Sequence, residues 1–156
     1  MPVPQHLKPS PFTDRVPPEL TEEEWLDVAG QATPEWVTGT DREYRAFRAG
    51  VGMIDFSMLP KWEITGPGAI AVLDAVFSRD VIRLAPGSIA YGAIVTEDGY
   101  MMDDCTVLVY GADHVRVTGG NWEVEEVIRL HLLPGTELVE LRDTIATLSV
   151  QGPRSR

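Results

Sequence analysis

The chain has 156 residues, of which 44% are hydrophobic, and this suits one ordinary domain, or one domain and part of another, with a packed core. Its 24 acidic and 13 basic residues give a formal charge of −11, with no Lys/Arg cluster for phosphates, so no nucleic-acid partner is expected. No apolar run is long enough to cross a bilayer and no targeting pattern begins the chain, so we expect a cytoplasmic protein without a membrane partner. Cys105 is the only cysteine, which excludes an internal disulfide and a zinc site built on several thiolates; no metal site is expected.

The N-terminal third is predicted to be an arm followed by two helices. Residues 1–20 hold six prolines, which predicts an extended arm that lies over another part of the protein and has no fold of its own. Two T-x-x-E capping boxes follow, at 21–24 and 40–43, and such boxes satisfy the free backbone N–H groups at a helix start. They predict helices over 21–29 and 40–49.

The middle of the chain shows regular strand and helix patterns. A strand that ends at Gly66-Pro67 is followed by apolar residues at helical spacing, and three short strands separated by tight turns then predict an antiparallel meander. The expected strands are 53–57, 62–65, 89–95, 105–110, 114–118 and 137–141, and the expected helices are 67–79 and 121–132. The expected core packs the first of these helices against the meander, through Ile70, Leu73, Val76 and Phe77 on one side and Val107, Val109, Val115 and Val117 on the other.

Strand, helix, meander, helix, strand is the order of a ferredoxin-like α+β sandwich with an added strand, which we place at 54–142. A strand followed by Gly-Pro recurs at 148–153, and the sequence stops where a further helix would begin. We therefore expect the front part of a longer protein, and a chance echo of two elements is the alternative.

One short stretch, GYMMDDCTV at 99–107, places two adjacent carboxylates behind two methionines where a strand is expected to begin. Asp103 and Asp104 either close a turn in water, where most carboxylates lie, or face a ligand. Met101 and Met102 would offer adaptable apolar surface to a flat ligand. The residues alone leave both alternatives open.

From Tyr44 to Pro153 the chain resembles the aminomethyltransferase family, which includes the T-protein of the glycine cleavage system and related tetrahydrofolate-dependent methyltransferases and demethylases. The resemblance rests on the order and spacing of four segments, YRAFRAGVGMIDFS, EITGPGAIAVLDAV, SRDVIRLAPGSIAYGAIVTEDGYMMDD and VQGP. It implies a three-domain enzyme around a folate, in which a ferredoxin-like folate-binding domain at 54–142 is inserted in an incomplete first domain formed by 1–53 and 143–156. The third domain would be missing here.

The resemblance also implies site residues. Asp103 matches the family's functional aspartate, which lies beside the reacting nitrogen of tetrahydrofolate and orients it for one-carbon transfer, whereas Asp104 would be a structural neighbour. A carboxylate can accept hydrogen bonds from the N–H groups of a reduced pterin. Leu59, Tyr91 and Met101 are further candidates for folate contact, and their alternative is a place in the core.

Two departures from the family pattern bear on the substrate. Met58-Leu59 and Gly119-Gly120-Asn121 stand where T-proteins commonly carry His-Met and Asn-Ala. The second departure alters the pocket wall and puts the glycine-cleavage substrate in doubt without removing the folate. Asp55 lies in the family's Gly-x-x-Asp-x-Ser stretch, where a buried, hydrogen-bonded structural role is one alternative.

The expected function is transfer of an aminomethyl or methyl group from a small donor to tetrahydrofolate, by a T-protein-like enzyme of which this chain alone would be inactive. A lipoyl carrier protein is a further candidate partner. Two alternatives remain: a non-enzymatic folate-binding module of the iron–sulfur cluster maintenance type, and a folate-dependent demethylase of a different donor.

Overall fold

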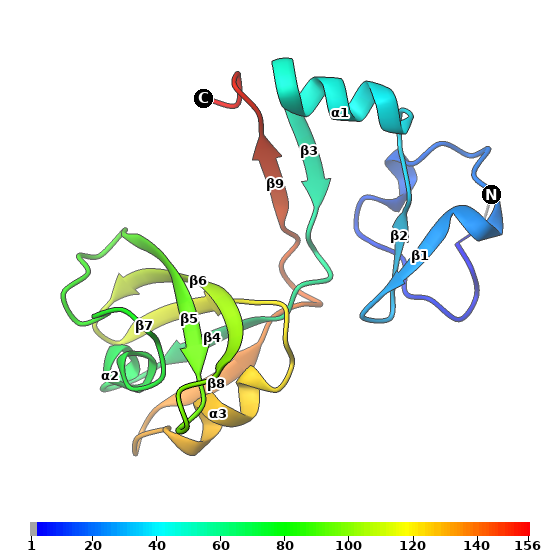
Figure 1. Ribbon diagram of the computed structural model, residues 1–156. Coiled ribbons are helices and arrows are strands. Elements are labelled where there is room, and N and C mark those ends of the chain that lie inside the picture. Colours follow the sequence, from blue (N-terminus) through cyan, green and yellow to red (C-terminus); the bar gives the residue numbers. More distant parts are fainter. Residues whose placement is uncertain (1–2) are drawn as a thin grey trace. The chain divides into compact units, whose positions relative to one another are not determined.

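A computed structural model describes residues 3–156, which form two compact units (Figure 1). Unit 1 comprises the described residues through Met58 together with Asp143–Arg156, and unit 2 comprises Leu59–Arg142. The boundary falls after residue 58 and not after residue 53. The reason is that strand β3, Gly52–Asp55, pairs antiparallel with β9, Leu148–Gln151, inside unit 1.

Unit 1 contains a hairpin where a helix was expected at 21–29, so that prediction is wrong. The capping box is present, since the Thr21 N–H donates to Glu24 Oε2 at 2.8 Å, but it closes only the single 3-10 turn η2, Glu22–Glu24. Strands β1, Trp25–Val28, and β2, Gln31–Pro34, follow and pair antiparallel. Ala29 and Gly30 both have positive φ, 53° and 79°, as a two-residue hairpin turn between such strands requires.

The N-terminal segment packs against the hairpin, which agrees with the prediction of an extended arm that lies over another part of the protein. Leu7 and Leu20 are buried with residues of the hairpin in a small apolar cluster, and Lys8 forms a parallel bridge with Gln31. The segment contains one 3-10 turn, η1, Thr13–Arg15. The proline-rich segment therefore lies against the hairpin and is held there by these contacts. Residues 1–2 lie outside the described part of the chain.

Helix α1, Thr40–Ala49, has its predicted bounds but a different cap. The residue before the helix is Gly39, and the Glu43 carboxylate turns back to accept hydrogen bonds from the N–H groups of Val37 and Thr38. The acidic side chain thus ties the incoming chain to the positively polarised end of the helix.

Unit 2 is a five-stranded antiparallel sheet with two helices. Its strand order is β5-β6-β7-β4-β8, so that the first strand in sequence lies between β7 and β8. In chain order the elements are β4 (Lys61–Thr65), α2 (Ala69–Asp74), β5 (Ile89–Val95), β6 (Met101–Gly111), β7 (His114–Thr118), α3 (Val124–Leu130) and β8 (Glu137–Glu140).

The core of unit 2 lies between one face of this sheet and both helices, as the sequence predicted. The four helix-side residues named above are buried except Ile70, which is partly buried, and all four valines of the meander belong to the same cluster. Helix α2 is shorter than predicted, because the chain after it adds to the sheet: Phe77 bridges Ile94, and the Ser78 N–H donates to the Ala93 carbonyl at 2.8 Å. Val76 and Phe77 are buried from that segment and not from the helix.

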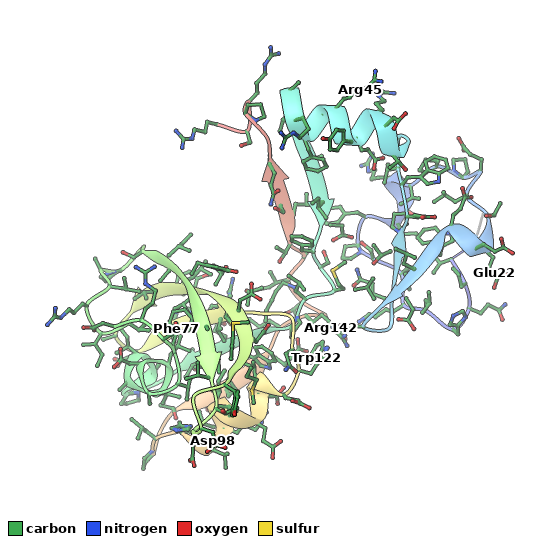
Figure 2. All side chains as sticks on the ribbon, in the orientation of Figure 1. Glu22, Arg45, Phe77, Asp98, Trp122 and Arg142 are labelled. Atoms are coloured by element: carbon green, nitrogen blue, oxygen red, sulfur yellow. The ribbon has the colours of Figure 1, made fainter. Side chains whose placement is uncertain are left out.

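An aromatic contact closes the core on the side of α3. Trp62 is fully buried, and its indole N–H donates to Glu125 Oε2 at 2.9 Å. The Trp62 and Trp122 rings meet edge to face with centroids 6.0 Å apart, and the Arg142 guanidinium lies 4.4 Å from the Trp122 centroid (Figure 2). The hydrogen bond from the Trp62 indole lowers the pKa of Glu125 below its ordinary value. Arg129 lowers this pKa further, whereas burial of the carboxyl raises it.

Candidate functional site

The two aspartates lie inside a strand, not in a turn. Strand β6 begins at Met101 and not at Cys105 as predicted, because the turn at 97–99 is closed by a Thr96 N–H to Tyr100 carbonyl bond of 2.9 Å and the strands pair directly beyond it. Asp103 stands opposite Ile94 and Asp104 opposite Ala93, with a bulge beside them in β6, where the register passes over Met102. Because side chains alternate along a strand, the two carboxylates leave opposite faces of the sheet.

Asp103 faces the side of the sheet that carries the helices, as Cys105 does. Its Oδ2 atom accepts hydrogen bonds from the backbone N–H groups of Gly120, at 2.7 Å, and Asn121, at 3.0 Å. The Cys105 thiol approaches the same oxygen at 3.5 Å. Within residues 3–156 no donor reaches Oδ1 of this half-buried carboxylate, so one of its oxygens is committed and the other is available.

The turn that holds Asp103 connects β7 to α3. The Gly119 N–H donates to the Pro60 carbonyl at 3.3 Å, and the Asn121 side-chain amide donates to the Met102 carbonyl at 3.2 Å. Asn121 also accepts from the Glu123 N–H at 2.9 Å, but α3 begins only at Val124 and has Glu123 as its N-cap residue, so the prediction that Asn121 caps a helix from 121 is wrong. Hydrogen bonds therefore fix the turn to the residue directly before Asp103 in β6 and to the residue directly before β4.

Asp104 has a different environment. It is exposed on the open face of the sheet and accepts a hydrogen bond from the hydroxyl of Tyr91, which is itself 62% exposed. The bond to Asp104 and the negative charge of that group raise the pKa of the Tyr91 phenol above its ordinary value. Tyr91 is thus paired with the second aspartate and not with the first.

The other sequence-predicted residues lie at the same end of unit 2. Met101 is 68% exposed at the start of β6, whereas Met102 packs against the core cluster. Leu59 is half-buried, and it directly precedes Pro60, whose carbonyl binds Gly119. The structure therefore brings the Leu59 segment to the turn that holds Asp103.

Sequence reasoning missed the main partners of Asp103, the backbone N–H groups at 120 and 121. A signal was present, because two consecutive glycines directly after a strand mark a turn where the backbone approaches something closely. It also missed the role of Cys105, which is buried. Burial, followed by the neighbouring Asp103 charge, raises the pKa of this thiol well above its ordinary value, so it stays protonated and can donate.

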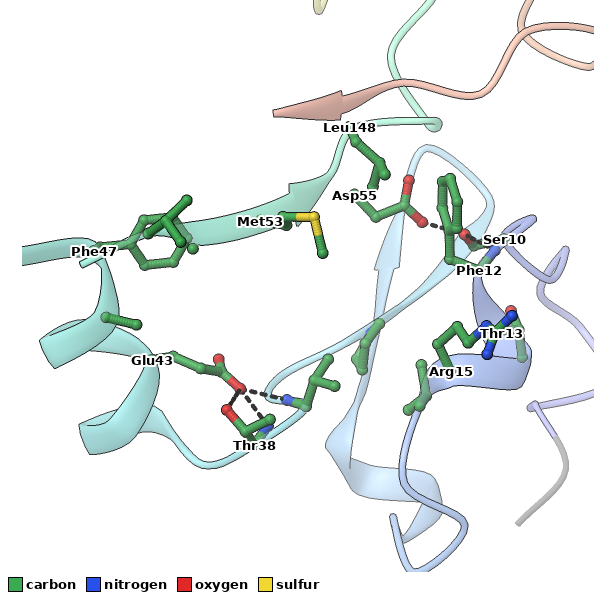
Figure 3. Close-up of a pocket in the computed structure, with 16 residues that line it drawn as sticks. Ser10, Phe12, Thr13, Arg15, Thr38, Glu43, Phe47, Met53, Asp55 and Leu148 are labelled. Atoms are coloured by element: carbon green, nitrogen blue, oxygen red, sulfur yellow. Dashed lines mark hydrogen bonds between the residues drawn. The ribbon is translucent and has the colours of Figure 1, made fainter. Parts of the chain in front are cut away.

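Unit 1 contains a separate cavity of about 350 Å³ between the N-terminal segment, α1 and β3 (Figure 3). Its walls are largely apolar, with Phe12, Phe47, Met53 and Leu148 among them. The acidic groups that line it are already bound: Glu43 holds the backbone before α1, and Asp55 accepts from the Ser10 hydroxyl and from the Ser57 N–H, the latter at 2.9 Å. Asp55 therefore has the structural role that was one of its two alternatives.

The part of the chain from residue 3 onward has neither a group of metal-ligating side chains nor a helix that could span a membrane. From residue 3 to the end, no set of three or more His, Cys, Asp and Glu side chains is grouped so that it could hold a metal ion. Over the same residues, every helix is too short or too polar to span a bilayer.

Comparison with known proteins identifies the fold of this chain and the family to which it belongs. The fold is similar to that of the crystal structure of glycine cleavage system aminomethyltransferase T from Bartonella henselae, with a TM-score of 0.78 over 96% of this chain and 42% of that one, at 21% identity. The family model described as the GCVT N-terminal domain matches residues 5–156. The chain belongs to this family.

Several curated proteins are similar to the chain. An aminomethyltransferase from Exiguobacterium sibiricum is 31% identical over 154 residues, which cover 96% of this chain and 41% of the relative. The gamma subunit of a heme-dependent oxidative N-demethylase from Ectopseudomonas mendocina is 32% identical over 77% of this chain and 32% of the relative. A trimethylamine-oxide aldolase from Ruegeria pomeroyi is 35% identical over 76% of this chain and 15% of its own length. The chain thus spans well under half of each relative.

Proposed function

We propose that this chain is the folate-binding part of an enzyme that transfers a one-carbon unit, aminomethyl or methyl, to tetrahydrofolate, with Asp103 as the carboxylate that faces the folate. The observation that carries the proposal is the arrangement of Asp103 in a chain of this family: one oxygen is held by a turn of backbone, and the other is left for a ligand. The folate would carry the one-carbon unit, and the protein would supply orientation and a placed acceptor.

The residues around Asp103 fit a reduced pterin. A carboxylate is an acceptor-only group when ionised, and the reacting part of a reduced pterin presents N–H donors. Met101 offers exposed apolar surface nearby, and Leu59 lies on the segment that contacts the turn at 119–121. We propose Met101 and Leu59 as folate contacts, and we leave Tyr91 out of this set because it is bonded to Asp104 on the other face of the sheet.

The topology supports a matching proposal for the architecture. The segments β4, α2, β6, β7, α3 and β8 follow the order of a ferredoxin-like sandwich, and β5 is the added edge strand. We propose that unit 2 is this folate-binding domain and that unit 1, whose two segments pair through β3 and β9, belongs to the split first domain of the family.

The donor distinguishes two versions of the proposal. In the first, the donor is an aminomethyl group on a lipoyl carrier protein, as the similarity to aminomethyltransferases supports. In the second, it is a methylated amine, which the names of the demethylase and aldolase relatives support at comparable identity. The glycine pair at 119–120 favours the second version, because the T-protein pattern has asparagine and alanine there.

Matched substitutions in the complete protein test the proposal. We expect Asp103→Asn to weaken tetrahydrofolate binding, measured by isothermal titration calorimetry, and to lower one-carbon transfer at least tenfold. Asp104→Asn is the control: it removes the same charge one residue away, on the other face of the sheet, and should change transfer by less than threefold. Equal and small effects of the two substitutions would refute the role given to Asp103.

The same experiment separates the enzyme from a folate-binding module. A module would bind tetrahydrofolate through Asp103 yet show no transfer from either class of donor. The 156-residue chain alone is expected to lack turnover, since catalysis needs groups held from several directions and the relatives are more than twice as long. Turnover by this chain at the rate of the complete protein would contradict that expectation.

A further inference from the structure

We infer that the turn Gly119-Gly120-Asn121 is a positioning element for Asp103, which fixes the carboxylate by its Oδ2 atom so that Oδ1 is presented to the ligand. The inference rests on the proposed function for the role of Asp103 and goes beyond it in assigning the turn. Gly119 is the residue on which the arrangement depends.

Three donors converge on one oxygen. The N–H groups of Gly120 and Asn121 and the thiol of Cys105 come from two different elements, the turn and strand β6, and all point at Oδ2. A carboxylate with both oxygens free can rotate about its last side-chain bond, whereas bonds to one oxygen hold that rotation. The other oxygen then has a fixed place before the ligand arrives, so less orientational freedom is lost on binding.

The approach of the turn is possible only because residue 119 has no side chain. A Cβ atom on Gly119 would overlap Asp103 Oδ2 and come within 2.8 Å of Cys105 Sγ. Gly119 does not have a positive φ, so its backbone conformation is open to any residue. The glycine therefore serves the close approach to the carboxylate and not the shape of the turn.

The turn is rigid enough to act as a support. The Gly119 N–H donates to the Pro60 carbonyl at 3.3 Å, and the Asn121 side-chain amide donates to the Met102 carbonyl at 3.2 Å. Hydrogen bonds therefore hold the turn at its first and last residues. Residue 119 is buried. A side chain introduced at 119 would therefore move the Asp103 carboxylate, because the backbone around it is held by other bonds.

The test compares two glycine-to-alanine substitutions in the complete protein. Gly119→Ala should weaken tetrahydrofolate binding at least tenfold in calorimetry. In the double variant, adding Asp103→Asn to Gly119→Ala should weaken binding by less than a further threefold. Gly111→Ala is the matched control at the far end of β6, where an added Cβ meets nothing within 4 Å and φ is not positive. It should leave binding within twofold of the unsubstituted protein.

A second measurement needs neither folate nor a folded Gly119→Ala variant. An amide proton that is hydrogen-bonded to an acceptor exchanges slowly with solvent, and this is measured by NMR. The amide protons of Gly120 and Asn121 should therefore be protected from exchange in the unsubstituted protein and should both lose that protection in Asp103→Ala. Equal exchange of these amides in the two proteins would overturn the inference.

The outcomes separate the two claims. If Asp103→Asn weakens tetrahydrofolate binding and a folded Gly119→Ala does not, the positioning role is wrong and the proposed function stands. If Asp103→Asn leaves binding unchanged, the proposed function fails, and the inference fails with it. Weakened binding in both variants without additivity, together with the loss of amide protection at both Gly120 and Asn121 in Asp103→Ala, is the result we expect.

Discussion

Removing the carboxylate of Glu125 should destabilise unit 2, because the buried indole of Trp62 depends on it. The Trp62 side chain has 0% exposure, and its N–H donates to Glu125 Oε2 at 2.9 Å. In Glu125→Ala this donor would stay buried without an acceptor, which costs about 1–3 kcal/mol. The half-exposed ion pair with Arg129, 2.6 Å long, adds about 0.3–0.5 kcal/mol.

The expected loss of about 1.5–3.5 kcal/mol is measurable by thermal unfolding followed by circular dichroism. It should lower the midpoint by about 3–14 °C for a protein of this size class. Glu126→Ala removes a neighbouring exposed carboxylate of the same helix and is the control, with an expected change within about 0.5 kcal/mol. A Glu125→Ala midpoint equal to that of the control would refute the dependence of the indole on this residue.

The pH dependence of the same site has a definite sign. The hydrogen bond from Trp62 lowers the pKa of Glu125 in the folded protein, so the folded state binds its proton less readily than the unfolded state. The stabilisation is therefore fully present above the ordinary pKa of glutamate, about 4.3, and is lost as the pH falls through the lowered value. Glu125→Gln keeps an acceptor for the indole but carries no charge. The free energy of unfolding of this variant should therefore be lower than that of the unsubstituted protein at pH 7, and the two values should converge in acid.

Three further predictions concern a core leucine, the buried thiol and one glycine with a positive φ. Leu73→Ala should cost about 2–5 kcal/mol in urea unfolding, since Leu73 is fully buried, and a cost under 1 kcal/mol would contradict the packing of α2. Cys105 should react with a disulfide reagent at pH 8 at least about a hundredfold more slowly when folded than in denaturant, because burial raises the pKa of the thiol; equal rates would contradict its burial. Gly66→Ala should destabilise by more than about 2 kcal/mol, since φ is +102° and a Cβ would overlap the Gly135 carbonyl oxygen; stability like that of Gly111→Ala would disprove this.

Local patterns predicted the parts of the fold that local chemistry determines. The bounds of α1 and the meander of β5, β6 and β7 follow from capping and alternation within a few residues. The capping box at 21–24 predicted a helix and was satisfied by one 3-10 turn. The choice between helix and strand was made by pairing of Trp25 with Pro34 across the hairpin, a contact that no local pattern contains.

The candidate site shows the same division. The sequence singled out Asp103 only through its match to a family motif, because two adjacent carboxylates by themselves left a turn in water and a ligand site both open. It could not reveal that the partners of this carboxylate lie 17 and 18 residues further on, at Gly120 and Asn121, nor that Tyr91 would bond to Asp104. These contacts depend on strand register and on a bulge in β6, which a single sequence does not specify.

The pairing of β3 with β9 bears on how the chain folds during synthesis. The two strands are separated by about 90 residues, so at a translation rate of about 5–20 residues per second β3 leaves the ribosome roughly 5–20 s before its partner. In that interval all of unit 2, Leu59–Arg142, is made, and its strand pairings and helices need nothing from β9. Unit 2 can therefore fold first on the nascent chain and bring the two ends of its own sequence together. Its folding would shorten the effective loop that β3 and β9 must close, so that the inserted unit acts as a nucleus for the unit that encloses it in sequence.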